Sequence, residues 1–88
     1  MYPRTVGGVP DLPDDAWLTD RLRAIADRIR LERERQNRTQ EWLYLTAGVS
    51  RWAVQDAESG LGNPTTKTLL RIARALGVPL STLIADED

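Results

Sequence analysis

Apolar residues recur along the chain at steps of three and four, the spacing of an α-helix that buries one face. The first stripe consists of Trp17, Leu18, Leu22, Ile25 and Ile29. Asp14 or Asp15 can cap this helix, and the pattern predicts that it runs to about Arg35. Asn37 suits the left-handed position that often follows a helix.

Two shorter helices are predicted in the middle of the chain. Thr39 offers a hydroxyl cap for a helix over about residues 40–46. Gly48 then allows a sharp turn with positive φ. Ser50 caps a third helix over about residues 51–59, which the next glycine ends.

Two further helices complete the pattern. Thr65 or Thr66 caps a helix that Gly77 stops, and a short helix starts near Pro79. Their expected inner side consists of Leu69, Leu70, Ile72, Ala73, Leu76, Leu80, Leu83 and Ile84. No alternating strand pattern or internal repeat occurs, so the predicted fold class is all-α, with five short helices.

The chain divides by composition into one domain with two flanks. Residues 1–13 contain three of the five prolines and little periodicity, and we expect them to form a flexible, extended arm. Residues 14–85 form the predicted domain, and residues 86–88 an acidic tail.

Composition excludes several kinds of chemistry. Without cysteine or histidine, the chain has no disulfide, thiol site, zinc site or histidine acid–base catalyst. No paired acids, activated nucleophile or phosphate loop appears, so we expect neither an enzyme nor a bound cofactor or metal. No apolar stretch is long enough to span a membrane and no signal peptide is evident. We therefore expect a soluble cytoplasmic protein.

The formal net charge of −1 argues at first against nucleic-acid binding, because domains that bind nucleic acid are usually basic. The charges are unevenly distributed, however. From Asp20 to Ile84, eleven Arg and Lys residues oppose seven acids, a net +4, whereas the flanks carry −5. The basic body permits phosphate binding.

A series of motifs follows in a fixed order. Gln40 opens the second predicted helix, Gly48 follows eight residues later and Ser50 two after that. Then come Glu58-Ser59-Gly60, Asn63-Pro64 and Leu69-Leu70-x-Ile72-Ala73-x-Ala75-Leu76-Gly77-Val78. From about Leu22 to Ile84 the chain resembles the Xre family, the DNA-binding domain of lambda-type phage repressors and their bacterial relatives.

This resemblance implies a compact lambda-repressor-like domain that binds double-stranded DNA as a homodimer. The expected function is a sequence-specific transcriptional regulator, a repressor, whose third helix enters the major groove of a palindromic operator. The residues that the resemblance places at DNA are Gln40, Ser50, Arg51, Trp52, Gln55, Asp56, Asn63, Thr65, Thr66 and Lys67.

The implied contacts differ in kind. Gln40 would bind a phosphate through its side chain and backbone N–H, or be a simple first-turn glutamine. Arg51 can bond guanine O6 and N7, or else a phosphate or solvent. Trp52 could pack on thymine methyls, or mark a protein interface. Asp56 could accept from cytosine N4, reject wrong sequences, or pair with Arg51 when DNA is absent.

The loop before the fourth helix matches the second phosphate-binding segment of the family. It comprises Leu61, Gly62 and Asn63, with Thr65, Thr66 and Lys67 at the helix start. Backbone N–H groups, hydroxyls and one lysine suit phosphate. Many relatives carry more cations here, so we expect modest affinity.

Arg33 and Glu58 match a buried ion pair of the family and are interpreted as structural. The chain departs from the family at Tyr44, where alanine is usual, and at Ala57, where a large aliphatic is usual. Tyr44 either fills the volume that Ala57 vacates or pushes the second and third helices apart.

Two other departures concern the corner between the first and second helices and the chain's start. Arg38 replaces a usual leucine, and Trp42 either covers this corner or meets the N-terminal extension. Trp17 and Leu18 precede the usual first helix, where they extend its core contact or form a dimer surface. Residues 1–19 could also bind a protein partner. The alternative function is a helical interaction module, or an antitoxin-like partner, with weak or lost DNA binding.

Overall fold

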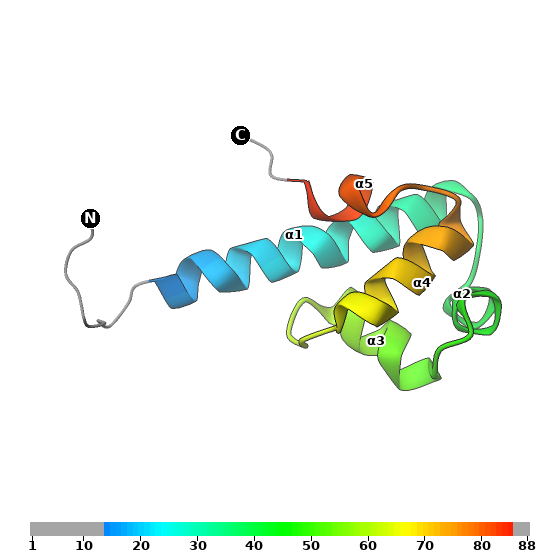
Figure 1. Ribbon diagram of the computed structural model, residues 1–88, viewed down its shortest axis with the longest axis horizontal. Coiled ribbons are helices and arrows are strands. Elements are labelled where there is room, and N and C mark those ends of the chain that lie inside the picture. Colours follow the sequence, from blue (N-terminus) through cyan, green and yellow to red (C-terminus); the bar gives the residue numbers. More distant parts are fainter. Residues whose placement is uncertain (1–13, 86–88) are drawn as a thin grey trace.

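The computed structural model describes residues 14–85, which contain five helices and no strand (Figure 1). The helices are α1 (Asp14–Arg35), α2 (Gln40–Ala47), α3 (Arg51–Ser59), α4 (Thr66–Leu76) and α5 (Leu80–Ile84). The predicted all-α fold of five helices is confirmed, with α2 ending one residue later than expected. The predicted arm, residues 1–13, and the acidic tail, residues 86–88, lie outside the described residues.

Side-chain caps begin three of the helices, at the residues that the sequence predicts. The hydroxyl of Thr39 accepts the N–H of Trp42 at 3.0 Å, at the start of α2. At the start of α3, the hydroxyl of Ser50 accepts the N–H of Ala53 at 3.0 Å. Thr65 rather than Thr66 caps α4. Each cap satisfies an N–H that has no partner within its own helix.

The turn between α2 and α3 depends on Gly48. Its φ of 72° lies in the left-handed region, and its N–H and that of Val49 both donate to the carbonyl of Tyr44. This geometry closes α2 within one residue and redirects the chain towards α3. Asn37, with φ 58°, has the same role after α1, as predicted.

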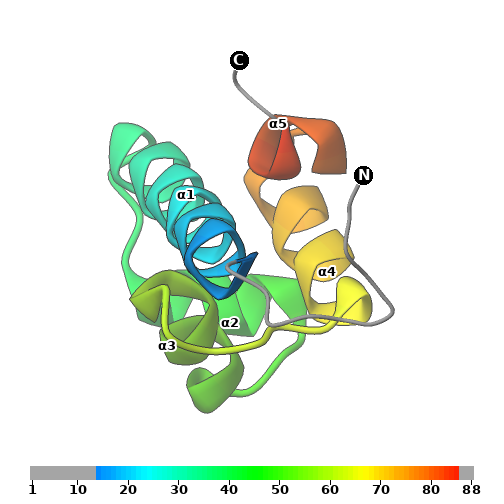
Figure 2. The same ribbon diagram turned by 90° about the vertical axis from the view of Figure 1, so that its left-hand side faces the viewer.

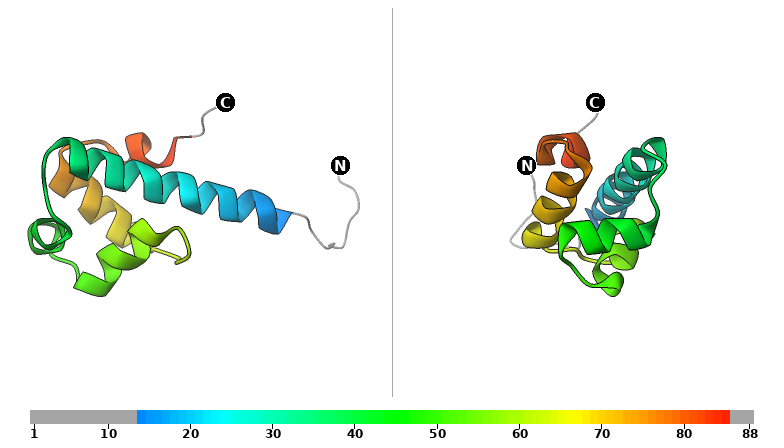
Figure 3. Two further views of the ribbon diagram at one scale, coloured as in Figure 1. Left: turned by 180° about the vertical axis from the view of Figure 1, so that it is seen from behind. Right: turned by 90° about the vertical axis from the view of Figure 1, so that its right-hand side faces the viewer.

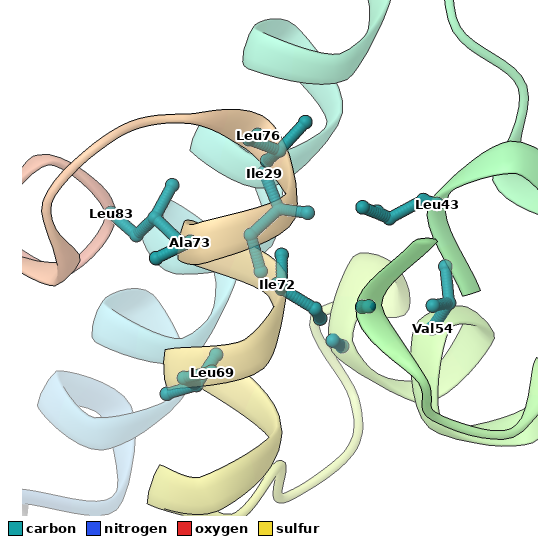
Figure 4. Close-up of a cluster of buried hydrophobic side chains, with 10 residues drawn as sticks. Ile29, Leu43, Val54, Leu69, Ile72, Ala73, Leu76 and Leu83 are labelled. Atoms are coloured by element: carbon teal, nitrogen blue, oxygen red, sulfur yellow. The ribbon is translucent and has the colours of Figure 1, made fainter. Parts of the chain in front are cut away.

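The five helices surround one apolar core (Figure 4). Helix α1 packs against α3, α4 and α5, and α2 packs against α3 and α4. Figure 2 shows α1 beside α4 and α5, with α2 and α3 along one side of this layer. The largest fully buried side chains come from all five helices and are Ile29, Leu43, Ile72, Leu83 and Val54. Burying each contributes on the order of 1.5–3 kcal/mol.

Four apolar residues that the pattern assigns to the core are exposed instead. Leu70 and Ile84 are 51% and 42% exposed, so their predicted core positions are wrong. Both lie beside buried residues, at the edge of an apolar stripe. Trp17 and Leu18 are 62% and 50% exposed, which contradicts the expected extension of the core. The first turns of α1 project past the other helices, so no neighbouring helix covers them (Figures 1 and 3).

The corner between α1 and α2 is covered by an arginine and a tryptophan. The Arg38 guanidinium carbon lies 4.5 Å from the centroid of the Trp42 ring. Trp42 is partly buried and packs against the core, so it covers this corner from α2. Tyr44 is also partly buried and packs against the core cluster that contains Ala57.

Candidate nucleic-acid interface

Helix α3 lies at the edge of the molecule opposite α5 (Figure 1). Val54, Ala57 and Glu58 point inward and are buried. At the start of the helix, Arg51 is exposed and Trp52 is 76% exposed. Within residues 14–85, no hydrogen bond or ion pair engages the Arg51 guanidinium. This end of α3 therefore exposes a cation and a large aromatic ring.

Two other predicted residues of α3 are less accessible or already engaged. Gln55 is half-buried, and Asp56 is exposed. Oδ2 of Asp56 accepts the backbone N–H of Asn63 at 3.2 Å. No ion pair between Asp56 and Arg51 is present in the described part of the chain. Ser50 is exposed and acts as the cap of α3.

Gln40 stands at the start of α2, but its side chain turns inward. Nε2 donates to Oε1 of Glu58 at 3.0 Å, so the amide joins a buried network. The first N–H groups of α2 have no partner within the helix, as at any helix N-terminus. The N–H of Trp42 is bonded to the Thr39 hydroxyl, so those of Gln40 and Glu41 are the remaining donors at this predicted phosphate site.

The start of α4 supplies a second group of donors. Thr66 and Lys67 are exposed in its first turn, where the backbone N–H groups and the helix dipole favour an anion. The hydroxyl of Thr65 is engaged as the cap, accepting from the N–H of Thr68 at 3.1 Å. The N–H of Asn63 is likewise engaged, by Asp56. Leu61, Asn63 and Thr65 are exposed as well, but the Thr65 hydroxyl and the Asn63 N–H already have partners within the protein.

A buried ionic network fixes α3 against the first two helices. Arg33 donates two hydrogen bonds to the Glu58 carboxylate, from Nε to Oε2 at 2.8 Å and from Nη2 to Oε1 at 2.9 Å. The structure thus brings the predicted pair together, and the Glu58 side chain is only 2% exposed. The hydrogen bond to Glu58 raises the pKa of Arg33 above its ordinary value, although burial opposes this.

Further bonds extend this network along the chain. Nη1 of Arg30 donates to the carbonyl of Glu58 at 2.6 Å, at the end of α3. Nη1 of Arg33 donates to the carbonyl of Arg38 at 2.7 Å, at the corner before α2. In the described residues no buried side-chain nitrogen or oxygen lacks a hydrogen bond. The network therefore sets the angle between α2 and α3 without an unsatisfied polar group.

One positioning contact has no signal in the sequence pattern. Nη1 of Arg71, on α4, donates to the carbonyl of Gly48 at 3.0 Å. This bond ties the turn between α2 and α3 to α4. An arginine on an exposed helix side is ordinarily solvated, so only the folded arrangement identifies this partner.

Several basic residues of the body bind protein groups instead of lying at the α3 surface. Arg21 and Arg28 both donate to the carbonyl of Ala85, after α5, and Arg35 pairs with Glu32 on α1. The net positive charge of the body therefore overstates the charge near α3. Within residues 14–85, no group of acids could hold a metal ion, and no helix is long and apolar enough to cross a membrane.

Comparison with known proteins agrees with this geometry. A family model described as helix-turn-helix matches residues 29–83, which include all of α2, α3 and α4. A crystal structure of the hypothetical transcription factor NHTF from Neisseria has a TM-score of 0.70 and 29% sequence identity to the chain. The alignment covers 86% of this chain and 84% of that one. No curated protein sequence matches. On the family match, this chain belongs to the Xre-type helix-turn-helix family.

Proposed function

We propose that the chain is a sequence-specific DNA-binding transcription regulator, a repressor, that places α3 in the major groove of its operator. The observation that carries this proposal is the exposed start of α3, where Arg51 and Trp52 face outward from a helix held by the buried Glu58 network. A helix end of this kind can reach base edges while the helix before it meets the backbone. The similarity to a hypothetical transcription factor supports the same function.

The contacts divide into base readers and phosphate binders. Arg51 is the proposed reader of guanine, and Trp52 packs on thymine methyls, with Ser50 and Gln55 beside them. The N-termini of α2 and α4 hold phosphates on either side, through the backbone at Gln40 and through Thr66 and Lys67. Phosphate contacts set the register of the helix, and α3 reads the sequence.

A homodimer on a palindromic operator follows from the small size of this surface. One α3 presents few side chains, so two copies on half-sites about ten base pairs apart would supply the specificity of a regulator. The exposed Trp17 and Leu18 on the projecting end of α1 support the dimer surface as their role.

The test is selection of binding sites from random DNA, followed by titration of Arg51→Ala. Loss of a bidentate guanine contact should weaken binding at least about tenfold and relax the preference at one position of each half-site. Arg74→Ala is the matched control, because it removes the same charge from the last turn of α4. Affinity should also fall steeply with salt, and two chains should bind each site.

An equal effect of the two arginine variants, or no selected sequence at all, would overturn the proposal. It would favour the second candidate, a helical protein-interaction module with weak or lost DNA binding. The 76% exposure of Trp52 favours that candidate, because a large exposed aromatic is common at protein interfaces.

A further inference from the structure

Asp56 is the one member of the predicted reading set whose charged side chain is directed at the protein's own backbone. It lies in the second half of α3, and its Oδ2 accepts the N–H of Asn63 at 3.2 Å. Asn63 belongs to the loop that leads through Pro64 into α4. The carboxylate therefore connects α3 to the chain that enters the next helix.

The second oxygen of Asp56 lies close to Gly62. A Cβ placed on Gly62 would lie 1.8 Å from Oδ1 and 2.0 Å from Cγ of Asp56. The loop backbone thus crosses directly over the carboxylate, and any side chain at position 62 would have to displace it. Glycine is needed here for close approach and not for an unusual φ.

Ser59 fixes the same loop from its other end. Its hydroxyl donates to the carbonyl of Asp56 at 2.9 Å and accepts the N–H of Leu61 at 3.0 Å. Two side chains of α3 therefore hold the loop over residues 61–63. The loop ends at the cap of α4, where Thr66 and Lys67 are exposed.

We propose that Asp56 is a positioning residue that fixes the loop between α3 and α4, and with it the phosphate-binding start of α4, and that it does not read bases. This inference rests on the proposed function. The loop contacts both carboxylate oxygens, Oδ2 through the Asn63 N–H and Oδ1 through the close approach of Gly62, which favours positioning over base reading. A carboxylate near DNA phosphates is repelled, and the bond from the Asn63 N–H offsets this disadvantage.

The test is a double-mutant cycle of Asp56→Ala and Gly62→Ala, read by DNA affinity. Each single change should weaken binding by about three- to tenfold, the effect of losing one hydrogen bond, on every sequence alike. Gly62→Ala should add almost nothing in the Asp56→Ala background, because the group that it displaces is already gone. A cost of Gly62→Ala that is equal in both backgrounds would overturn the proposal.

Asp56→Asn separates positioning from base reading. The amide oxygen can still accept the Asn63 N–H while the negative charge is removed, so binding should stay equal or strengthen on all sequences. Repeated selection from random DNA should return the same preferred sequence for Asp56→Asn and Asp56→Ala. A changed preference at one base position would show that Asp56 reads DNA and would overturn the inference.

Hydrogen exchange of the Asn63 amide, measured without DNA, tests the contact with Asp56 independently of whether the protein binds DNA. Exchange should accelerate in Asp56→Ala and Gly62→Ala and remain slow in Asp56→Asn. Unchanged exchange in all three would overturn the loop contact whatever the DNA result. Slow exchange in the wild type together with no DNA binding would overturn the proposed function alone and leave the contact intact.

Discussion

The inward and outward faces of α3 differ in the number of groups that fix each side chain. On the inward face, the Glu58 carboxylate receives three hydrogen bonds, two from Arg33 on α1 and one from Gln40 on α2. On the outward face, Arg51 and Trp52 are exposed, and the Arg51 guanidinium has no bonded partner within residues 14–85. One face holds the helix at its angle, and the side chains of the other are exposed.

On the function that we propose, this difference assigns stability and recognition to separate residues of one short helix. A change on the inward face alters the free energy of unfolding and, through the angle of α3, everything that the helix contacts. A change on the outward face leaves the fold intact. On the function that we propose, the binding preference can therefore change at Arg51 and Trp52 without loss of the framework.

The largest effect is expected from Glu58→Ala, which leaves the Arg33 guanidinium buried without its partner. Breaking such a pair costs about 3–5 kcal/mol of the free energy of unfolding. Glu34→Ala is the matched control, because Glu34 lies 3.9 Å from the same arginine but its side chain is 64% exposed. It should cost less than about 1 kcal/mol. Urea denaturation measures both, and similar losses would remove the distinction between the two faces.

The two tryptophans around α2 and α3 test the distinction with one residue type. Trp42→Ala removes a partly buried ring and its contact with Arg38, and should cost roughly 2 kcal/mol. Trp52→Ala removes a ring that is 76% exposed and should change stability by less than about 0.5 kcal/mol. Thermal unfolding of the two variants makes the comparison. Strong destabilisation by Trp52→Ala would mean that the outward face also holds the fold.

The framework was predictable because its signals are local. The caps at Thr39, Ser50 and Thr65 and the left-handed residues Asn37 and Gly48 each satisfy or redirect the backbone within a few positions. Sequence periodicity also identifies the buried side of most helices. The helix boundaries follow from these two signals.

Some side chains are not where the sequence predicts them, because their surroundings depend on contacts between helices that the spacing of apolar residues does not reveal. Periodicity shows that Trp17 belongs to an apolar stripe, but not that the start of α1 projects past the other helices. Leu70 is apolar and adjacent to Leu69, yet it lies beyond the edge of the buried side of α4. The Gln40 side chain bonds to Glu58, which is 18 positions away in the sequence. Asp56 bonds to Asn63, which is seven positions away. Such partners are set by how helices pack.

The smallest expected change in stability comes from Thr65→Ala at the start of α4, and it is compared with the same substitution at the adjacent Thr66. Thr65→Ala removes the oxygen that accepts the N–H of Thr68, and the loss of such a cap costs about 1 kcal/mol. In a domain of this size that lowers the melting temperature by about 4–8 °C. Thr66→Ala changes an exposed first-turn residue and should leave the melting temperature nearly unchanged.

DNA binding should rank the same two variants in the opposite order. If Thr66 binds a phosphate, Thr66→Ala weakens binding on all sequences by a few-fold and leaves the sequence preference unchanged. Thr65→Ala, assayed well below its melting temperature, should retain nearly the affinity of the wild type, because its hydroxyl already serves the helix. The melting temperature and the dissociation constant of each variant decide the point. A single variant that lowers the melting temperature and raises the dissociation constant would show that one threonine serves cap and phosphate together, so the separation of framework and binding surface that we propose for α3 would not extend to α4.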